Sequence, residues 1–85
     1  MKEFNFTITD PAGIHARPAG LLVRQAHPYT SEISVLKGER KANAKSMLSM
    51  MGLGAKSGET VIIKAEGADE ETAIVELEAF FKANL

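Results

Sequence analysis

The sequence has no cysteine, and no run of apolar residues approaches the length of a membrane span. Without cysteine the chain can form neither a disulfide nor a thiolate zinc site, which fits a reducing compartment. The N-terminus runs straight into a strand-like pattern and lacks the apolar core of a signal peptide, so we expect a cytoplasmic protein without membrane insertion. Ten basic and eleven acidic side chains nearly cancel, so nonspecific nucleic-acid binding is not expected.

The length and composition predict one small folded domain. The 85 residues fit a single domain, 1–85, with a limited core. An apolar content of 45% with 25% charged residues is typical of a globular chain. No repeat, linker or low-complexity segment divides it.

Seven elements are predicted in the order β-α-β-β-α-β-α. Alternating apolar residues indicate strands, and apolar residues three and four apart indicate helices. Pro28 ends the first helix, and Asp69 is a candidate N-cap for the last. We therefore predict an α+β fold, a two-layer sandwich whose periodicity leaves the spatial strand order open. The strands are expected at 2–9, 31–37, 40–44 and 60–66, and the helices at 16–27, 47–51 and 70–83.

The segment around His15 combines features that suit an anion. His15 lies at the predicted start of the first helix, where the free amides of Ala16 and Arg17 point outward at the positive end of the dipole. Pro18 has no amide to lose, and its fixed φ favours helix initiation. The Arg17 guanidinium adds a fork of donors that matches phosphate. Gly13 can adopt conformations closed to other residues, so a partner's backbone could come close.

An imidazole beside such an anion site can accept a phosphoryl group. A neutral ring nitrogen is nucleophilic near pH 7, and the resulting P–N bond breaks readily. A lone histidine at a helix start can also be a simple polar cap, and the residues alone leave both interpretations open. The combination of Gly13, His15, Arg17 and Pro18 is more specific than any one of them.

The second helix carries more apolar residues than one face can bury. Ser46 precedes it and is a good N-cap. Some of the apolar residues should point inward, and others should stay exposed on a surface that meets partners, where methionine is common. The residues concerned are Met47, Leu48, Met50, Met51 and Leu53.

Three segments together resemble the HPr family, the histidine-containing phosphocarriers of the bacterial sugar phosphotransferase system. They are GIHARPA (13–19), KSMLSMMGLG (45–54) and SGETVIIKAEGADEETA (57–73). The resemblance covers essentially the whole chain. It implies an open-faced β-sandwich with the antiparallel strand order 1-4-2-3 and helices on one face.

The resemblance also implies the chemistry. His15 would be phosphorylated on Nδ1 by enzyme I, which takes its phosphate from phosphoenolpyruvate, and would pass the group to IIA domains of sugar permeases. Arg17 would stabilise the phosphate, and Pro18 would shape the helix start. Such a protein is a covalent carrier without cofactor or metal, and it is not a free-standing enzyme.

Regulation and docking follow from the same resemblance. Ser46 matches the site of an HPr kinase/phosphorylase, whose product would engage a transcriptional co-regulator. Partners would dock on the first two helices. The docking residues implied are Gly20, Arg24, His27, Met47, Leu48 and Met51.

Three alternative interpretations explain parts of the sequence. A metal site shared by His15 and His27 is disfavoured because they lie about 18 Å apart along one helix. An RNA-binding sandwich would need exposed stacking aromatics, which the strands lack. A related carrier of a nitrogen-linked phosphotransferase chain keeps the fold, whereas a regulator acting only through Ser46 is disfavoured because such proteins lose the histidine.

Overall fold

The computed structural model describes residues 1–85 and contains the seven elements in the expected order. Element boundaries differ from the expected ones by a few residues at most. The strands are β1 (Lys2–Thr7), β2 (Glu32–Lys37), β3 (Arg40–Asn43) and β4 (Thr60–Glu66). The helices are α1 (Ala16–Ala26), α2 (Met47–Leu53) and α3 (Glu70–Asn84).

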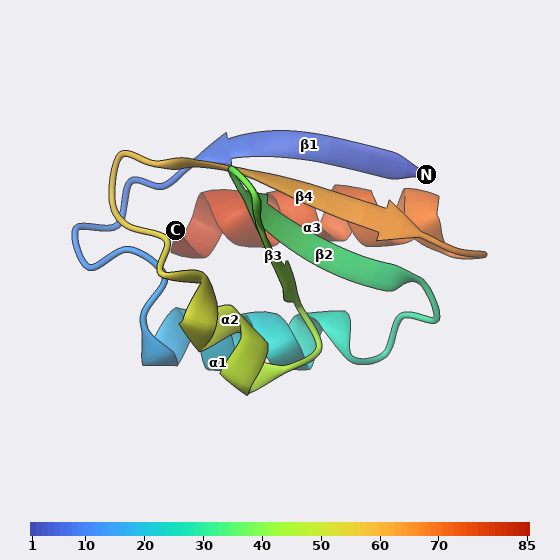
Figure 1. The fold of residues 1–85 in the computed structure, drawn as a ribbon. Helices are drawn as coiled ribbons and strands as arrows, with labels where there is room; N and C mark the ends of the chain where they lie inside the picture. Colours follow the sequence, from blue (N-terminus) through green and yellow to red (C-terminus); the bar gives the residue numbers. More distant parts are fainter.

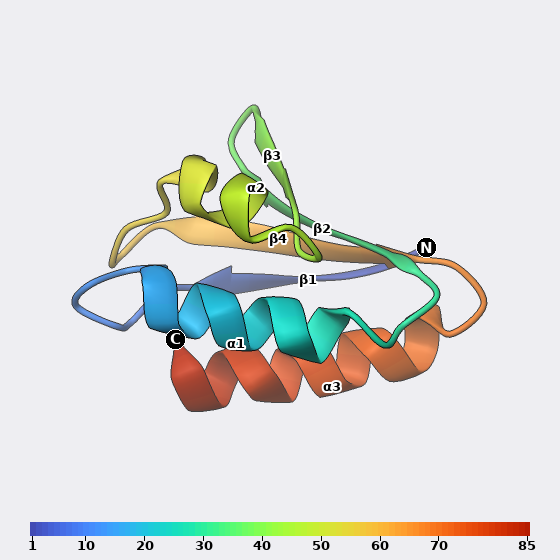
Figure 2. The same ribbon diagram turned by 90° about the horizontal axis from the view of Figure 1, so that it is seen from below.

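The four strands form one antiparallel sheet in the order β1-β4-β2-β3. On the central strand β4, Ile63 pairs with Phe4 on one side and Val35 on the other. Helices α1 and α3 lie on the same face of the sheet (Figure 1), side by side and running in opposite directions (Figure 2). The predicted α+β class and the implied strand order are confirmed. None of the three helices is long and apolar enough to cross a membrane.

The core lies between this face of the sheet and the helices. Ile33 and Val35 of β2 point into it, and Leu22 of α1 is fully buried. From α3, Leu77 and Phe81 are buried four residues apart. Two further apolar residues of α3, Ile74 and Phe80, are only partly buried because each lies one position off that row, at the edge of the buried face.

Two phenylalanines of β1 fasten this edge strand to α3. The ring centroid of Phe81 lies 5.7 Å from that of Phe4 and 5.4 Å from that of Phe6, in edge-to-face arrangements. Such aromatic pairs add to the stabilisation from area burial alone. They therefore hold the strand that leads into the His15 segment against α3.

Strand β1 ends at Thr7, two residues before the predicted boundary. The amides of Thr9 and Asp10 donate to the Leu85 carbonyl at 2.7 and 2.8 Å. They therefore bond to the end of α3 and not to the neighbouring strand. Helix α2 extends beyond residue 51 to Leu53 and is followed by Gly54, whose φ of +69° makes it a left-handed C-cap.

Asp69 occupies the N-cap position of α3 but makes no capping hydrogen bond, so that part of the prediction is wrong. Its carboxylate instead accepts from the amides of Thr30 and Ser31, both at 2.9 Å, and from the Ser31 hydroxyl. The Ser31 hydroxyl and the Thr30 amide lower the pKa of Asp69 to about 2. Gly67, with φ +154°, permits this approach because a Cβ there would lie 2.6 Å from the Ser31 Cα.

The Asp69 contacts predict an acid-dependent stability difference. The pKa of Asp69 falls from 3.8 to about 2 on folding, so its contribution is present above about pH 4 and is lost as the pH falls towards 2. We expect the Tm of Asp69→Ala to lie below that of wild type at pH 6, and this gap to close between pH 4 and 2. Glu71→Ala removes an exposed carboxylate at the start of α3, and its Tm should show no such pH-dependent difference from wild type. A gap that persists unchanged at pH 2 would contradict the assignment.

Candidate functional site

His15 is the N-cap residue of α1, with an extended backbone at φ −101° and ψ −175°. Its carbonyl accepts the Ala19 amide at 3.0 Å, which starts the helix. Its side chain makes no capping hydrogen bond and is 41% exposed. The interpretation of His15 as a simple polar cap is therefore wrong, and the ring is accessible to a partner.

The start of α1 presents the donors that the sequence predicted. Neither the Ala16 nor the Arg17 amide finds an acceptor within the chain. Pro18 is buried in the first turn and contributes no amide. The Arg17 side chain is exposed and forms no ion pair. Two free amides and a free guanidinium thus sit next to an exposed imidazole in the chain, an arrangement that can bind a phosphoryl group.

Asp10 also belongs to this site, a role that the sequence alone did not predict. Its Oδ2 lies 3.7 Å from the His15 Nε2. Its Oδ1 accepts the Ala12 amide at 2.8 Å, and its carbonyl accepts the Gly13 amide at 2.9 Å. The signal in the sequence was the turn formed by residues 10–13, which folds its first residue back towards the histidine that follows. No third histidine, cysteine or carboxylate joins the pair to make a metal-binding group.

Gly13 fits its position because another part of the same chain lies against it. Its φ is +69°, and a Cβ there would stand 2.5 Å from the Ala55 carbonyl oxygen and 2.8 Å from the Lys56 Cα. The Ile14 amide also donates to Ala55, at 3.0 Å. The expectation that Gly13 admits a partner's backbone is thereby corrected: Ala55 and Lys56 occupy that space.

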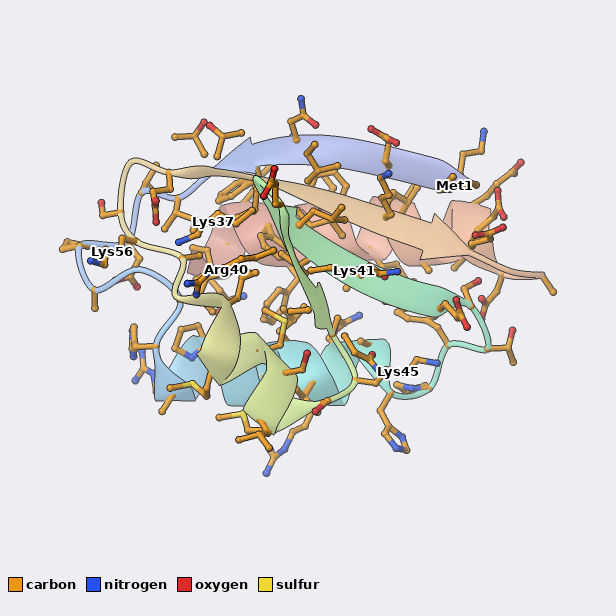
Figure 3. All side chains as sticks on the ribbon, viewed as in Figure 1. Met1, Lys37, Arg40, Lys41, Lys45 and Lys56 are labelled. Atoms are coloured by element: carbon orange, nitrogen blue, oxygen red, sulfur yellow. The ribbon has the colours of Figure 1, made fainter.

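Two side chains of the β2–β3 hairpin hold the end of α2 and the loop after it. Lys37 Nζ donates to the Gly54 carbonyl at 2.9 Å, and Arg40 to the Gly52 carbonyl at 3.4 Å. Both cations suit the negative end of the helix dipole. Figure 3 shows the two labelled side chains reaching from the β2–β3 hairpin towards the end of α2. The hairpin thus supports the loop on which the His15 turn rests.

The same loop is closed internally by Glu59. The Lys56 amide donates to its carboxylate at 2.7 Å, and this bond is the main reason that the pKa of Glu59 lies below its usual range. Lys37 adds a 3.5 Å contact to the same oxygen. The backbone at Ala55 and Lys56 is therefore fixed independently of the Gly13 turn that packs on it.

Ser46 caps α2 as predicted. Its Oγ accepts the Ser49 amide at 3.2 Å, and the Ser49 Oγ in turn accepts the Asn43 amide at 2.8 Å. The Ser46 side chain is partly exposed. Capping is thus a demonstrated role, and it leaves the hydroxyl at the positive end of the α2 dipole.

Helices α1 and α2 share an exposed face, here called the α1–α2 surface. Met50 and Leu53 point inward, whereas Leu48 is 86% exposed, so the predicted division of the apolar residues is confirmed. A Cβ at Gly20 would lie 4.0 Å from the Met47 side chain, which places the two helices in contact. Leu21 of α1 is also exposed, a feature that the sequence did not predict. The surface comprises Gly20, Leu21, Arg24, His27, Met47, Leu48 and Met51.

Comparison with known sequences identifies the family. Residues 2–83 match the family model described as the PTS HPr component phosphorylation site. The phosphocarrier protein HPr of Lysinibacillus sphaericus is 49% identical over 73 residues, covering 86% of this chain and 83% of that protein. HPr of Mycoplasma genitalium is 40% identical over 99% of this chain and 97% of its own length.

Comparison with solved structures agrees. The crystal structure of HPr-C-His from Thermoanaerobacter tengcongensis superposes with a TM-score of 0.93 at 43% identity, covering 99% of this chain and 94% of that one. The Bacillus subtilis catabolite repression protein Crh, solved as a swapped-domain dimer, has a TM-score of 0.78 at 33% identity over 100% of this chain and 98% of that one.

These likenesses extend over the sheet, the helices and all three segments on which the resemblance rests. The chain belongs to the HPr family. It is a phosphocarrier of the phosphotransferase system.

Proposed function

We propose that His15 accepts a phosphoryl group on Nδ1 from phosphorylated enzyme I and passes it to IIA domains of sugar permeases. The observation that carries this proposal is the exposed imidazole at the start of α1, beside two amides without an acceptor. Membership of the HPr family supports the same assignment. The protein acts in the cytoplasm as a covalent intermediate carrier and not as a free-standing catalyst.

The transfer balances without a cofactor. The lone pair of Nδ1 attacks phosphorus, the P–N bond to the donor histidine breaks, and its electron pair stays on the donor ring. Nε2 of His15 keeps its proton throughout. The phosphoryl oxygens are held by the amides of Ala16 and Arg17 and by the Arg17 guanidinium, while Pro18 preorganises the first turn. Onward transfer to a IIA domain is the same step with His15 as the donor.

The α1–α2 surface is the proposed docking site for these proteins. Its exposed methionines can adapt to several partners. Arg24 on α1 and His27 at its C-cap are also exposed and would steer acidic partner surfaces. The complexes must be short-lived, because every cycle of transfer requires release.

We further propose Ser46 as the target of an HPr kinase/phosphorylase, with the phosphorylated form engaging a transcriptional co-regulator. A phosphate at the start of α2 meets the positive end of the dipole, so the fold would tolerate it. Ser46 immediately precedes Met47 of the α1–α2 surface, so added negative charge would act on docking. The likeness to Crh, a catabolite repression protein, is consistent with such a regulatory branch.

A Ser46→Asp variant tests the effect of charge at this position. Aspartate retains a good cap, so α2 should stay folded. Like-charge repulsion should raise the KM for phosphorylation by enzyme I about five-fold. The measurement is the initial rate of labelling at several concentrations of the variant. Thr72→Asp, which adds the same charge on an exposed position of α3, should leave the rate unchanged. Wild-type kinetics for Ser46→Asp would contradict the proposal.

The proposed transfer is tested by incubating the protein with enzyme I and labelled phosphoenolpyruvate. We expect about one phosphoryl group per chain, released by acid and retained in alkali, as a phosphohistidine requires. The absence of acid-labile phosphate would reject the assignment. Replacing enzyme I by its counterpart from a nitrogen-linked chain distinguishes the two branches, because only the cognate donor should phosphorylate the protein rapidly.

A further inference from the structure

We propose that Asp10 is a positioning residue for His15: it holds the ring proton on Nε2 and so leaves the lone pair of Nδ1 for the phosphoryl group. This inference deepens the proposed function and rests on it. The juxtaposition that carries it is the 3.7 Å separation between the Asp10 Oδ2 and the His15 Nε2.

The Asp10 carboxylate is anchored independently of the ring. Its Oδ1 is engaged by the Ala12 amide at 2.8 Å, which leaves Oδ2 as the oxygen that faces His15. The Asp10 amide donates to Leu85 at 2.8 Å, and its carbonyl accepts the Gly13 amide at 2.9 Å. Three hydrogen bonds to three different residues thus fix the direction from which a negative charge acts on the imidazole.

A carboxylate can only accept, so beside a ring nitrogen it favours the tautomer in which that nitrogen carries hydrogen. Here the favoured hydrogen is on Nε2, and the free lone pair is on Nδ1. The separation of 3.7 Å exceeds a hydrogen bond, so the carboxylate acts through its charge. When phosphorus bonds to Nδ1 and Nε2 keeps its proton, the ring becomes cationic next to the same carboxylate. The carboxylate therefore favours a proton on Nε2 both before and after His15 is phosphorylated.

The substitution Asp10→Asn is informative because of the anchored oxygen. The asparagine Oδ1 can still accept the Ala12 amide, so the turn is retained. The NH2 group then takes the place of Oδ2 and directs a donor at Nε2, which reverses the preference. Glu71→Gln is the matched control, because it removes one negative charge at the start of α3, at the opposite end of the molecule from the start of α1 (Figures 1 and 2).

The measurement is the tautomer ratio of His15, read from the ring nitrogen shifts of 15N-labelled, unphosphorylated protein at a pH where the ring is neutral. In Asp10→Asn we expect the ratio of the Nε2–H to the Nδ1–H form to fall about three-fold, a size suited to a partly exposed contact. Glu71→Gln should keep the wild-type ratio. In Asp10→Ser the hydroxyl can keep the turn but no group lies near Nε2, so its tautomer ratio should lie between those of wild type and Asp10→Asn. Equal ratios in wild type and both Asp10 variants would overturn the inference.

Phosphoryl uptake from enzyme I supplies the second readout. We expect the initial rate to fall about three-fold in Asp10→Asn, in step with the tautomer ratio. The two proposals fail separately, because the tautomer ratio is measured without any donor. If His15 takes no label at all, the proposed transfer is wrong whatever the ratio. If wild type and Asp10→Asn take label equally and share one ratio, transfer stands and the role of Asp10 is rejected.

Discussion

Replacing His15 with alanine abolishes acid-labile phosphorylation by enzyme I while leaving the fold intact; this is the largest functional effect we expect. The imidazole is the only group at the start of α1 that can bond covalently to phosphorus in the proposed step, so no residual transfer should remain. The side chain is 41% exposed and makes no capping bond, so its loss should change the Tm little. Labelling from radioactive phosphoenolpyruvate, with acid and alkali treatment, measures the first effect, and thermal unfolding measures the second.

His27 provides the internal control for this experiment. It is the other histidine of the chain and is exposed at the end of α1. His27→Ala should still reach about one acid-labile phosphoryl group per chain at completion, whatever its rate of docking. Acid-labile label on His15→Ala, or its loss from His27→Ala, would contradict the choice of His15.

Substituting Gly13 with alanine should cost the largest amount of stability, about 3 kcal/mol, because two penalties combine at this residue. The φ of +69° is strained for any residue with a Cβ, and the added atom would stand 2.5 Å from the Ala55 carbonyl oxygen. The colliding atoms belong to backbone that Lys37 and Glu59 hold in place, so they cannot yield cheaply. Denaturant unfolding measures the loss.

Gly38→Ala separates the two penalties. Gly38 lies in the β2–β3 turn with φ +58°, and nothing stands within 4 Å of a Cβ built there. Its substitution should therefore cost about 1 kcal/mol from strain alone. We also expect slower phosphoryl uptake in Gly13→Ala and not in Gly38→Ala, because only the former displaces the turn that carries His15. Equal losses of stability in the two variants would show that the packing against Ala55 contributes nothing.

Local patterns predicted the elements well because their causes are local. Alternation in TVIIKAE defines β4 to the residue, and the Ser46 cap depends only on the amide three positions later. The amides of Ala16 and Arg17 are free because any helix leaves its first amides unpaired. These features need no knowledge of which segments meet in space.

The features that were missed depend on contacts between distant segments. Asp69 was expected to cap α3, but Thr30 and Ser31 offer it three donors, and that alternative exists only once the segment before β2 lies beside the start of α3. Gly13 was expected to leave room for a partner's backbone, because nothing in the neighbouring sequence indicates that Ala55 packs against it. An apolar period of two or 3.6 residues indicates which face of a strand or helix is buried. It does not indicate which distant segment packs against a turn.

The two ends of the chain differ in their distance from the chemistry, and this matters for anyone who attaches a label or fusion partner. Leu85 accepts hydrogen bonds from Thr9 and Asp10, so any group joined after it emerges beside the turn that leads to His15. Met1 lies at the other end of the sheet (Figure 1). A fluorophore, affinity handle or surface tether is therefore better placed before Met1, where it leaves the imidazole unobstructed.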